Sequence, residues 1–383
     1  MDQDTARRLF EEGATLVVLD APSGIEFGID LETWETGPLF QGVKMIPPGM
    51  HYVHSSAIDR KHGGTAMRSG IFRSFAAREV VVQRWDAGTE QLVDAQEEAQ
   101  GVGAHLRDID NRLGAYPVGI TRDGESPGTA YARWTRLAGH ITAATTSRVL
   151  PAQGCFSAAT GSAYEDEELD RARILAKRAS LELDDQLPSV AGDTTDRFAF
   201  PLIDLRRSFP RNAEPAEIRK YSVDKTWLLR TMLRSQWNGE AGQLVGEFQL
   251  AFLVVLVGQN FTGLEHWKRL MHLVLGSASA FEDPVLVTTL FVPFLRALQN
   301  QLDACPDEFA SVVLEQDNCV ASLLATFVLN LYECPGDTRD LDRIVTELRE
   351  FFADRHGWTL PHGWQLQEEA DEETGEYAPQ IIQ

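Results

Sequence analysis

Residues 246–275 constrain the fold most, because they join an almost wholly apolar segment to an amphipathic one. The segment 248–257 is apolar on nearly all sides, which is typical of a helix in the middle of a helical domain. It is shorter than the about 20 apolar residues that span a bilayer. Gly258 and Asn260 follow with the chemistry of a helix end. Residues 264–275 place apolar side chains at three- and four-residue steps, which predicts an amphipathic helix packed back on the buried one.

The first half of the chain has a different pattern. Short β-prone runs separated by Gly and Pro predict an antiparallel sandwich or barrel. The predicted strands cover residues 15–19, 25–29, 43–46, 50–55, 69–75 and 80–85. A polar helix over 5–12 precedes them. Helices follow from residue 96, one of them with an apolar stripe that includes Trp134. We expect the later helices to close one side of the sheet domain.

The second half predicts helices. Pro215 suits the first turn of one helix, and Ser222 or Asp224 could cap the next. The later helices are predicted over 285–298 with a kink at Pro293, 309–314, 320–332, and 340–355 ending at Gly357.

The two patterns together predict an α+β chain of two domains. An antiparallel, sandwich-like β-rich domain with closing helices covers residues 1–164, and an all-α domain covers 200–363. Residues 165–199 between them are rich in carboxylates and include Pro and Gly, which favours a linker that buries little apolar surface. Residues 364–383 form an acidic tail.

The charge balance limits the classes of partner. The chain carries 57 Asp and Glu against 35 Lys and Arg, a formal net charge of −22. Nucleic-acid binding needs clustered cations, and an anionic membrane surface attracts them too, so neither partner is expected. A basic protein partner fits better.

The cysteines and the N-terminus suggest a compartment. Cys155, Cys305, Cys319 and Cys334 are scattered without a C-x-x-C pair, so neither a disulfide framework nor a zinc site is predicted. The N-terminus lacks the apolar core of a signal peptide. Both observations favour a reducing, intracellular location. The sequon at Asn260 is therefore not expected to carry a glycan.

Each candidate for a metal or hydrolase site lacks a required element. His51 and His54 are three residues apart on a predicted strand, so their side chains point to opposite faces. The triplet 62–64, His-Gly-Gly, resembles an esterase oxyanion loop, but no G-x-S-x-G elbow accompanies it. The segment 222–225 fits S-x-x-K without the later S-D-N and K-T-G elements, and helix capping explains it better.

Further motifs of catalysis are also missing. The sequence has neither a G-x-x-x-x-G-K-[ST] phosphate loop nor a G-x-G-x-x-G turn. His266 beside Trp267 lies in a predicted packed helix, and we interpret it as structural. No catalytic, cofactor-binding or metal-binding residue is predicted.

A family resemblance covers almost the whole chain. Residues 42–49 read Gly-Val-Lys-Met-Ile-Pro-Pro-Gly, after Gly-Ile-Glu-Phe-Gly-Ile-Asp at 24–30. Later segments, Gly-Glu-Phe-Gln-Leu-Ala-Phe at 246–252 and Glu-His-Trp-Lys-Arg-Leu at 265–270, fit as well. This pattern resembles the AAR-two family of splicing factors. The segment 165–199 matches the family poorly.

The resemblance implies a function that the composition does not. Members of the family are assembly chaperones of the U-five small nuclear ribonucleoprotein. They bind the large spliceosomal scaffold protein through its RNase H-like and Jab/MPN-like domains. The resemblance implies a non-enzymatic protein without cofactors. It implies a location in the cytoplasm, either alone or together with the nucleus. It also implies a VHS-like fold for the helical domain.

Two other classes of function remain open at this point. A VHS-like helical domain also occurs in trafficking or signalling adaptors, although such an adaptor would not need the sheet domain. A hydrolase would need the constellations that are missing above.

The tail supplies the predicted partner-binding residues. The run 377–382 is the β-prone apolar segment after Trp364, and acidic residues precede it. Packing in the core, a frayed end, and a strand added to a partner's sheet edge are the three alternatives. The strand hypothesis assigns partner binding to Tyr377, Pro379, Ile381 and Ile382.

Overall fold

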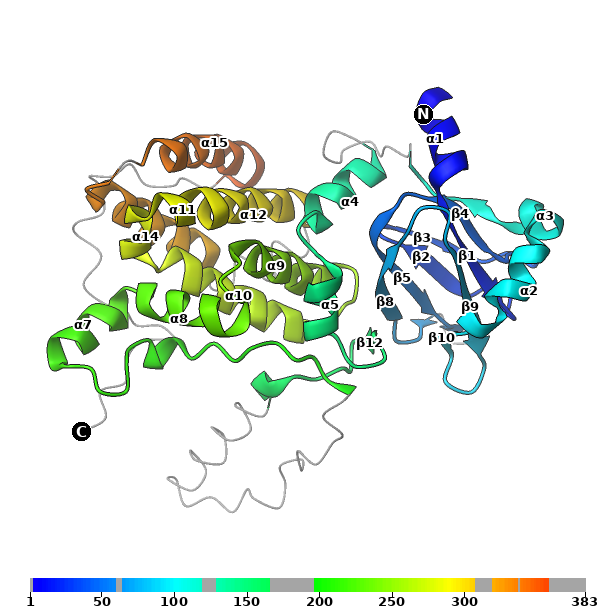
Figure 1. Cartoon of the computed structure of the whole chain (residues 1–383), viewed down its shortest axis with the longest axis horizontal. Coiled ribbons are helices and arrows are strands. Elements are labelled where there is room, and N and C mark those ends of the chain that lie inside the picture. The colour runs from blue at the N-terminus through cyan, green and yellow to red at the C-terminus, as the bar shows by residue number, and fades with distance from the viewer. Residues whose placement is uncertain are drawn as a thin grey trace, which may run out of the picture. The chain divides into compact units, whose positions relative to one another are not determined.

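The computed structural model describes residues 3–59, 64–118, 129–165, 196–306, 319–336 and 338–357. The chain divides into two compact units. One comprises Met1–Phe200 with Leu253–Gly263, and the other comprises Pro201–Phe252 with Leu264–Gln383. The first unit holds the strands and the second is helical (Figure 1), so the predicted order of a β-rich domain and a helical domain is confirmed.

Two five-stranded sheets form the first unit. The first sheet has the order β10-β9-β1-β4-β11, with β1 (Ala14–Leu19), β4 (Gly42–Ile46), β9 (Val80–Asp86), β10 (Gln91–Asp94) and β11 (Gly114–Ala115). The second has the order β12-β8-β5-β2-β3, with β2 (Glu26–Ile29), β3 (Glu32–Glu35), β5 (Gly49–Ser56), β8 (Ser69–Phe75) and β12 (Cys155–Ser157). A small pair, β6 (Ile58–Asp59) and β7 (Gly64–Thr65), completes the strands described. All six predicted strands are present.

Strand direction differs between the two sheets. The second sheet is antiparallel throughout, as predicted. The first is mixed, because β1 pairs with β9 in parallel and β4 pairs with β11 in parallel. Parallel strands need a crossover connection. Here the chain between β1 and β9 builds most of the second sheet, and the antiparallel expectation is incomplete for this reason.

The alternation along β1 explains how the sheets are covered. Leu16 and Val18 join a core cluster with Phe27 and Val53 of the second sheet. Val17 points the other way, into a smaller cluster that includes partly buried residues of α2 (Ala99–Ala104) and α3 (Leu106–Ile109). The prediction that helices close one side of the sheet domain is confirmed. Three more helices belong to this unit: α1 (Gln3–Glu12), α4 (Ala130–Ala138) and α5 (Ala143–Val149).

The second unit is built around α9 (Ala241–Leu256) and α10 (Phe261–Leu275), the two helices predicted from the apolar stretch. The other helices are α7 (Pro215–Val223), α8 (Thr226–Gln236), α11 (Pro284–Leu286), α12 (Val292–Ala304), α14 (Cys319–Glu333) and α15 (Arg339–His356), with short turns η4 (Leu205–Arg207) and η5 (Ala278–Glu282). The helix predicted over 309–314 lies outside the described residues. Within the described part of the chain, only the joined pair α8 and α9, bent by 93°, has the length and apolar composition of a membrane span.

Aromatic rings fill the interior of the helical unit. Phe248 of α9 stacks on Phe294 of α12 with a centroid distance of 4.0 Å and on Trp267 of α10 at 5.8 Å. Phe281 lies 5.1 Å from Phe327 of α14. Aromatic pairs of this geometry add to the stabilisation from apolar burial. These contacts explain why the apolar residues of the 246–275 stretch determine the arrangement of this unit.

The helix ends at Pro215, Gly258, Asn260 and Gly357 follow the sequence signals. Pro215 occupies the first turn of α7, and Gly357 ends α15 with φ of 65°. A π-helical turn, η6 (Val287–Phe291), immediately precedes Pro293, where a kink was predicted. Proline lacks the N–H that continues an α-helix, which fits this change of pitch. Asn260 helps to end α9 as predicted, because its backbone N donates to the Val254 carbonyl at 3.1 Å, and Gly258 N donates to the Leu253 carbonyl at 3.2 Å. Asn260 also begins the next helix. Its Oδ1 accepts from Thr262 N at 2.9 Å and so caps α10.

The sequon residue is enclosed within the first unit. Asn260 is 0% exposed, and its Nδ2 donates to the carbonyl oxygens of Ser157 and Thr160, both at 2.8 Å. A glycan on this side chain would remove both hydrogen bonds and needs space that the fold does not provide.

Candidate functional site

The partner-binding residues predicted from the tail lie outside the described residues. Tyr377, Pro379, Ile381 and Ile382 all follow residue 357, where the description ends. Their role stays a prediction. The triplet 62–64 also falls largely outside the described residues.

His51 belongs to a closed polar cluster in the first unit. Its Nδ1 donates to Asp30 Oδ2 at 2.6 Å, and its Nε2 donates to the Pro47 carbonyl at 2.8 Å. The Tyr116 hydroxyl donates to the same Asp30 oxygen at 2.5 Å. Burial, and then the Asp30 charge, raise the pKa of Tyr116 well above its usual range. All three side chains are buried and mutually satisfied, so a structural role follows.

His54 lies on the other face of β5, as predicted. It is 1% exposed and stacks on Tyr52 with a centroid distance of 5.4 Å. Burial and the nearby Arg68 charge lower the pKa of His54 to about 3, which keeps the ring neutral. Among the described residues, no group of three or more His, Cys, Asp or Glu side chains could hold a metal ion.

The S-x-x-K segment packs as part of a helix junction. Asp224 Oδ1 accepts from Thr226 N at 2.9 Å, so its capping role for α8 is confirmed. Ser222 does not cap, because its Oγ donates to the Ile218 carbonyl at 2.6 Å within α7. The Lys225 ammonium donates to the Ser222 carbonyl and to the Ser208 hydroxyl. It does not contact the Ser222 hydroxyl among the described bonds, because that hydroxyl bonds Ile218.

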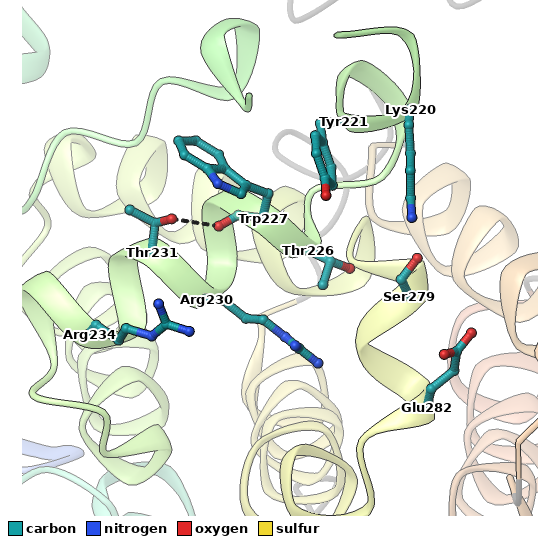
Figure 2. A pocket seen from close by; sticks show the side chains of 9 residues that line it. All are labelled: Lys220, Tyr221, Thr226, Trp227, Arg230, Thr231, Arg234, Ser279 and Glu282. Carbon is teal, nitrogen blue, oxygen red and sulfur yellow. Dashed lines mark hydrogen bonds between the residues drawn. The ribbon is translucent and has the colours of Figure 1, made fainter. Parts of the chain in front are cut away.

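The helical unit contains a pocket of about 370 Å³ between α7, α8 and η5. Figure 2 shows its lining residues, with the Lys220 and Tyr221 side chains reaching down from α7 toward Thr226 and Ser279. The lining residues are Lys220, Tyr221, Thr226, Trp227, Arg230, Thr231, Arg234, Ser279 and Glu282. We call this the α7–α8 pocket.

One face of α8 makes most of the pocket wall. Trp227, Arg230, Thr231 and Arg234 recur at steps of three and four residues, which places them on one side of the helix. The Thr231 hydroxyl donates to the Trp227 carbonyl at 2.8 Å, so its proton is used within the helix. The opposite face of α8 buries Leu228, Leu229, Met232 and Leu233 in the core. Trp227 is half-buried and lines the pocket.

The pocket is cationic although the chain is acidic. It holds Lys220, Arg230 and Arg234 against the single carboxylate of Glu282. Arg230 Nη2 lies 3.5 Å from Asp283 Oδ2, while the Lys220 Nζ lies 5.6 Å from the centroid of the Tyr221 ring. Within the described ranges, Lys220 and Arg234 have no carboxylate partner at salt-bridge distance.

This arrangement suits the binding of anionic groups. Arg and Lys side chains can donate hydrogen bonds to carboxylates, and the rings of Trp227 and Tyr221 offer apolar surface beside them. The pocket lining contains no Cys, His or Asp, and its hydroxyl and carboxylate groups do not form a nucleophile–base pair at hydrogen-bond distance among the described contacts. The geometry therefore supports recognition of a ligand.

The pocket was missed in the sequence because its walls come from three elements. The spacing of Trp227, Arg230 and Arg234 on α8 was a detectable signal of a polar–aromatic helix face. Lys220 lies on α7, on the other side of the junction between α7 and α8. Glu282 lies about 50 residues after Arg230 in the sequence. Only the fold brings these three segments together.

Comparison with known proteins covers both units. The family model described as the AAR2 N-terminal domain matches residues 12–151, and the one described as the AAR2 C-terminal repeat region matches residues 200–361. The chain is 34% identical over 340 residues to the Homo sapiens protein named Protein AAR2 homolog, covering 85% of each chain. The Mus musculus relative of the same name gives the same identity and coverage. The Caenorhabditis elegans relative is 28% identical over 364 residues, which is 91% of this chain and 95% of its own.

Proposed function

This chain belongs to the AAR2 family, and from that premise we propose that it is a non-enzymatic assembly factor of the spliceosome. On this proposal it binds the large spliceosomal scaffold protein, through the scaffold's RNase H-like and Jab/MPN-like domains, during biogenesis of the U-five small nuclear ribonucleoprotein. It thereby supports pre-mRNA splicing. It acts in the cytoplasm, with a possible nuclear pool, and uses neither a cofactor nor direct contact with nucleic acid. The observation that carries the proposal is the match of both family models, in order, along one chain.

The chemistry of the described residues supports a binding role. His51 is buried, and both of its ring nitrogens are hydrogen-bonded to protein groups. The α7–α8 pocket has cations and aromatic rings on its walls. These are the features of a protein that recognises a surface or a segment of another chain.

The acidic character of the chain supports a second part of the proposal. A protein with a net charge of −22 can cover basic, RNA-binding surface on the scaffold and keep RNA away until assembly. The test is the affinity of structured spliceosomal RNA for the scaffold, with and without this protein. Equal affinity in both cases would remove this part of the proposal.

The tail is the proposed binding element. Strand addition at a sheet edge supplies main-chain hydrogen bonds, with alternate side chains choosing the site. Pro379 cannot donate such a bond, so it must start the strand or face away from the pairing edge. Tyr377, Ile381 and Ile382 would then lose solvent on binding.

Deletion of residues 377–383 tests this element. We expect weaker scaffold binding with nearly the same melting temperature of the free protein. Ile381→Asp should weaken binding in the same direction, while Gln380→Ala serves as the matched control. Unchanged affinity after the deletion would refute the role of the tail, and a large drop in melting temperature would favour core packing.

One pull-down from cell extract, read by mass spectrometry, tests the proposal as a whole. Recovery of the spliceosomal scaffold supports it. Recovery of endosomal cargo instead would favour the alternative of a trafficking or signalling adaptor, and the absence of any stable partner would contradict both.

A further inference from the structure

We propose that the α7–α8 pocket binds the acidic segment 368–376 of this chain's own tail. The segment reads Glu-Glu-Ala-Asp-Glu-Glu-Thr-Gly-Glu and lies between the last described helix and the β-prone run 377–382. The inference concerns the free chain and does not depend on the proposed function. The ligand of the pocket is then an acidic peptide segment.

The pocket carries more positive than negative charge. Three cations and the carboxylate of Glu282 line a cavity of about 370 Å³ on a chain whose net charge is −22. Arg230 is held in place by Asp283, whose other oxygen accepts from Val285 N at 3.1 Å. Lys220 and Arg234 are exposed and, in the part of the chain that is described, stand without a carboxylate partner. The site is therefore a local region of positive potential, which an anionic ligand neutralises.

The pocket also has surface for the carbon atoms of acidic side chains. Trp227 and Tyr221 are half-buried, and their ring centroids lie 6.5 Å apart at one side of the cavity. Glutamate carries two methylene groups, which can pack on such rings while its carboxylate reaches a guanidinium. A mobile inorganic anion would leave this surface unused, so a peptide rich in glutamate fits better.

The segment 368–376 has the matching charge. It holds six carboxylates, and no Lys or Arg occurs after Arg355. The other acidic stretch, 166–195, contains four basic residues among its acids, which weakens its attraction to a cationic pocket. Among the acidic stretches of this chain, the tail segment is therefore the better complement.

Chain length permits the contact. The 20 residues from Gly357 to Glu376 span up to about 66 Å when extended. A compact domain of about 170 residues has a radius of gyration of about 16 Å. The segment can therefore reach the pocket from the end of α15. Attachment to the same chain also gives it an effective concentration in roughly the millimolar range, which favours it over an acidic peptide in solution.

The first experiment is zero-length carbodiimide coupling of the full chain at low protein concentration. Lys220 is the amine of the pocket, so we expect an amide link between Lys220 and a carboxylate of 368–376 in monomeric protein, identified by peptide mass spectrometry. Arg234→Glu should lower its yield by about fivefold, since it removes one surface ion pair and adds repulsion. Arg343→Glu is the matched control, because Arg343 is exposed on α15 and lines no described pocket, and its yield should match that of the unmodified chain.

The second experiment asks whether the tail occupies the pocket. A full chain with the six carboxylates of 368–376 changed to amides should bind a fluorescein-labelled peptide of residues 365–383. The unmodified chain should bind it at least about tenfold more weakly, because its own tail competes at high effective concentration. Fluorescence anisotropy measures both affinities, and Arg234→Glu in the amide variant should weaken binding of the peptide.

Three results would overturn the proposal. The first is a Lys220 link that appears only in cross-linked dimers, which would make a second copy the occupant. The second is equal peptide affinity for the unmodified chain and the amide variant, which would leave the pocket to another acidic ligand. The third is an equal loss of cross-link yield in Arg234→Glu and Arg343→Glu.

Discussion

Replacing Glu247 by glutamine should loosen the helical unit selectively. Glu247 lies on α9 and is 0% exposed. Its Oε1 accepts from His266 Nε2 at 2.6 Å, and its Oε2 accepts from Trp237 Nε1 at 2.9 Å. The carboxylate therefore links α9 to α10 and to the residue that follows α8. Glutamine keeps the shape but offers one acceptor oxygen and one amide group.

The magnitude follows from these two contacts. Both ring N–H groups need an acceptor, so Glu247→Gln turns one of them toward an amide N–H. A buried donor that loses its partner costs about 1–3 kcal/mol. The short contact from His266 has a carboxylate as its acceptor, and a hydrogen bond to a charged group contributes about 1.5–3 kcal/mol. We expect a loss of about 3 kcal/mol in the free energy of opening of this unit, at the upper end of these ranges, because Glu247 and His266 are both fully buried.

Hydrogen exchange of the full chain measures this loss region by region. A decrease of about 3 kcal/mol corresponds to roughly 100-fold faster exchange of the most protected α9 and α10 amides, since each 1.4 kcal/mol is tenfold. The β1 amides in the same sample should keep their rates. Glu240→Gln is the matched control, because Glu240 is exposed and, among the described contacts, its carboxylate bonds only the Gln243 side chain. An effect in Glu247→Gln no larger than in this control would refute the reasoning.

Three further predictions concern the sheet unit and the chain's organisation. Burial lowers the pKa of His54 to about 3, so below about pH 6.5 the unfolded chain binds a proton that the folded chain does not. The stability of the sheet unit is therefore full above about pH 6.5 and falls by about 2 kcal/mol at pH 5. Hydrogen exchange of the β5 amides measures this loss, which should be smaller in His54→Gln. Gly28→Ala should lower the melting temperature strongly, because its Cβ would lie 2.1 Å from His54 Nε2, whereas Gly37→Ala, with nothing within 4 Å, should leave it unchanged. Limited proteolysis should cut first within residues 165–199 or after residue 363, and early cuts within 248–275 would contradict the predicted domain boundaries.

Local periodicity explains the parts of the fold that the sequence predicts correctly. In strands such as β1 and β8 most of the six or seven positions are buried. The helix α9 is apolar on nearly all sides, and the amphipathic helix α10 follows it directly. Six short strands were missed, namely β3, β6, β7, β10, β11 and β12. In β3, Glu32 and Glu35 flank Trp34, and the strand forms because it pairs with β2 in a hairpin whose turn includes Asp30 at a φ of 57°.

Features that depend on contacts between distant segments could not be predicted from the sequence. The parallel pairing of β1 with β9 has no local signature. The α7–α8 pocket requires Lys220 and Glu282 to approach one face of α8. His266 was interpreted correctly as structural, but its partner Glu247 could not be named, because 19 residues and a helix reversal separate them.

The parallel pairing of β1 with β9 has a consequence for synthesis of the chain on the ribosome. Thr15 faces Val80, so about 65 residues must follow β1 before its second neighbour exists. At about 5–20 residues per second, this delay is roughly 3–13 s. During it β1, whose Leu16 and Val18 are buried in the finished sheet, has only β4 as an available neighbour. A nascent chain that pauses before residue 86 leaves an apolar strand edge open to other chains, so the translation rate through β8 and β9 sets how long this edge is exposed.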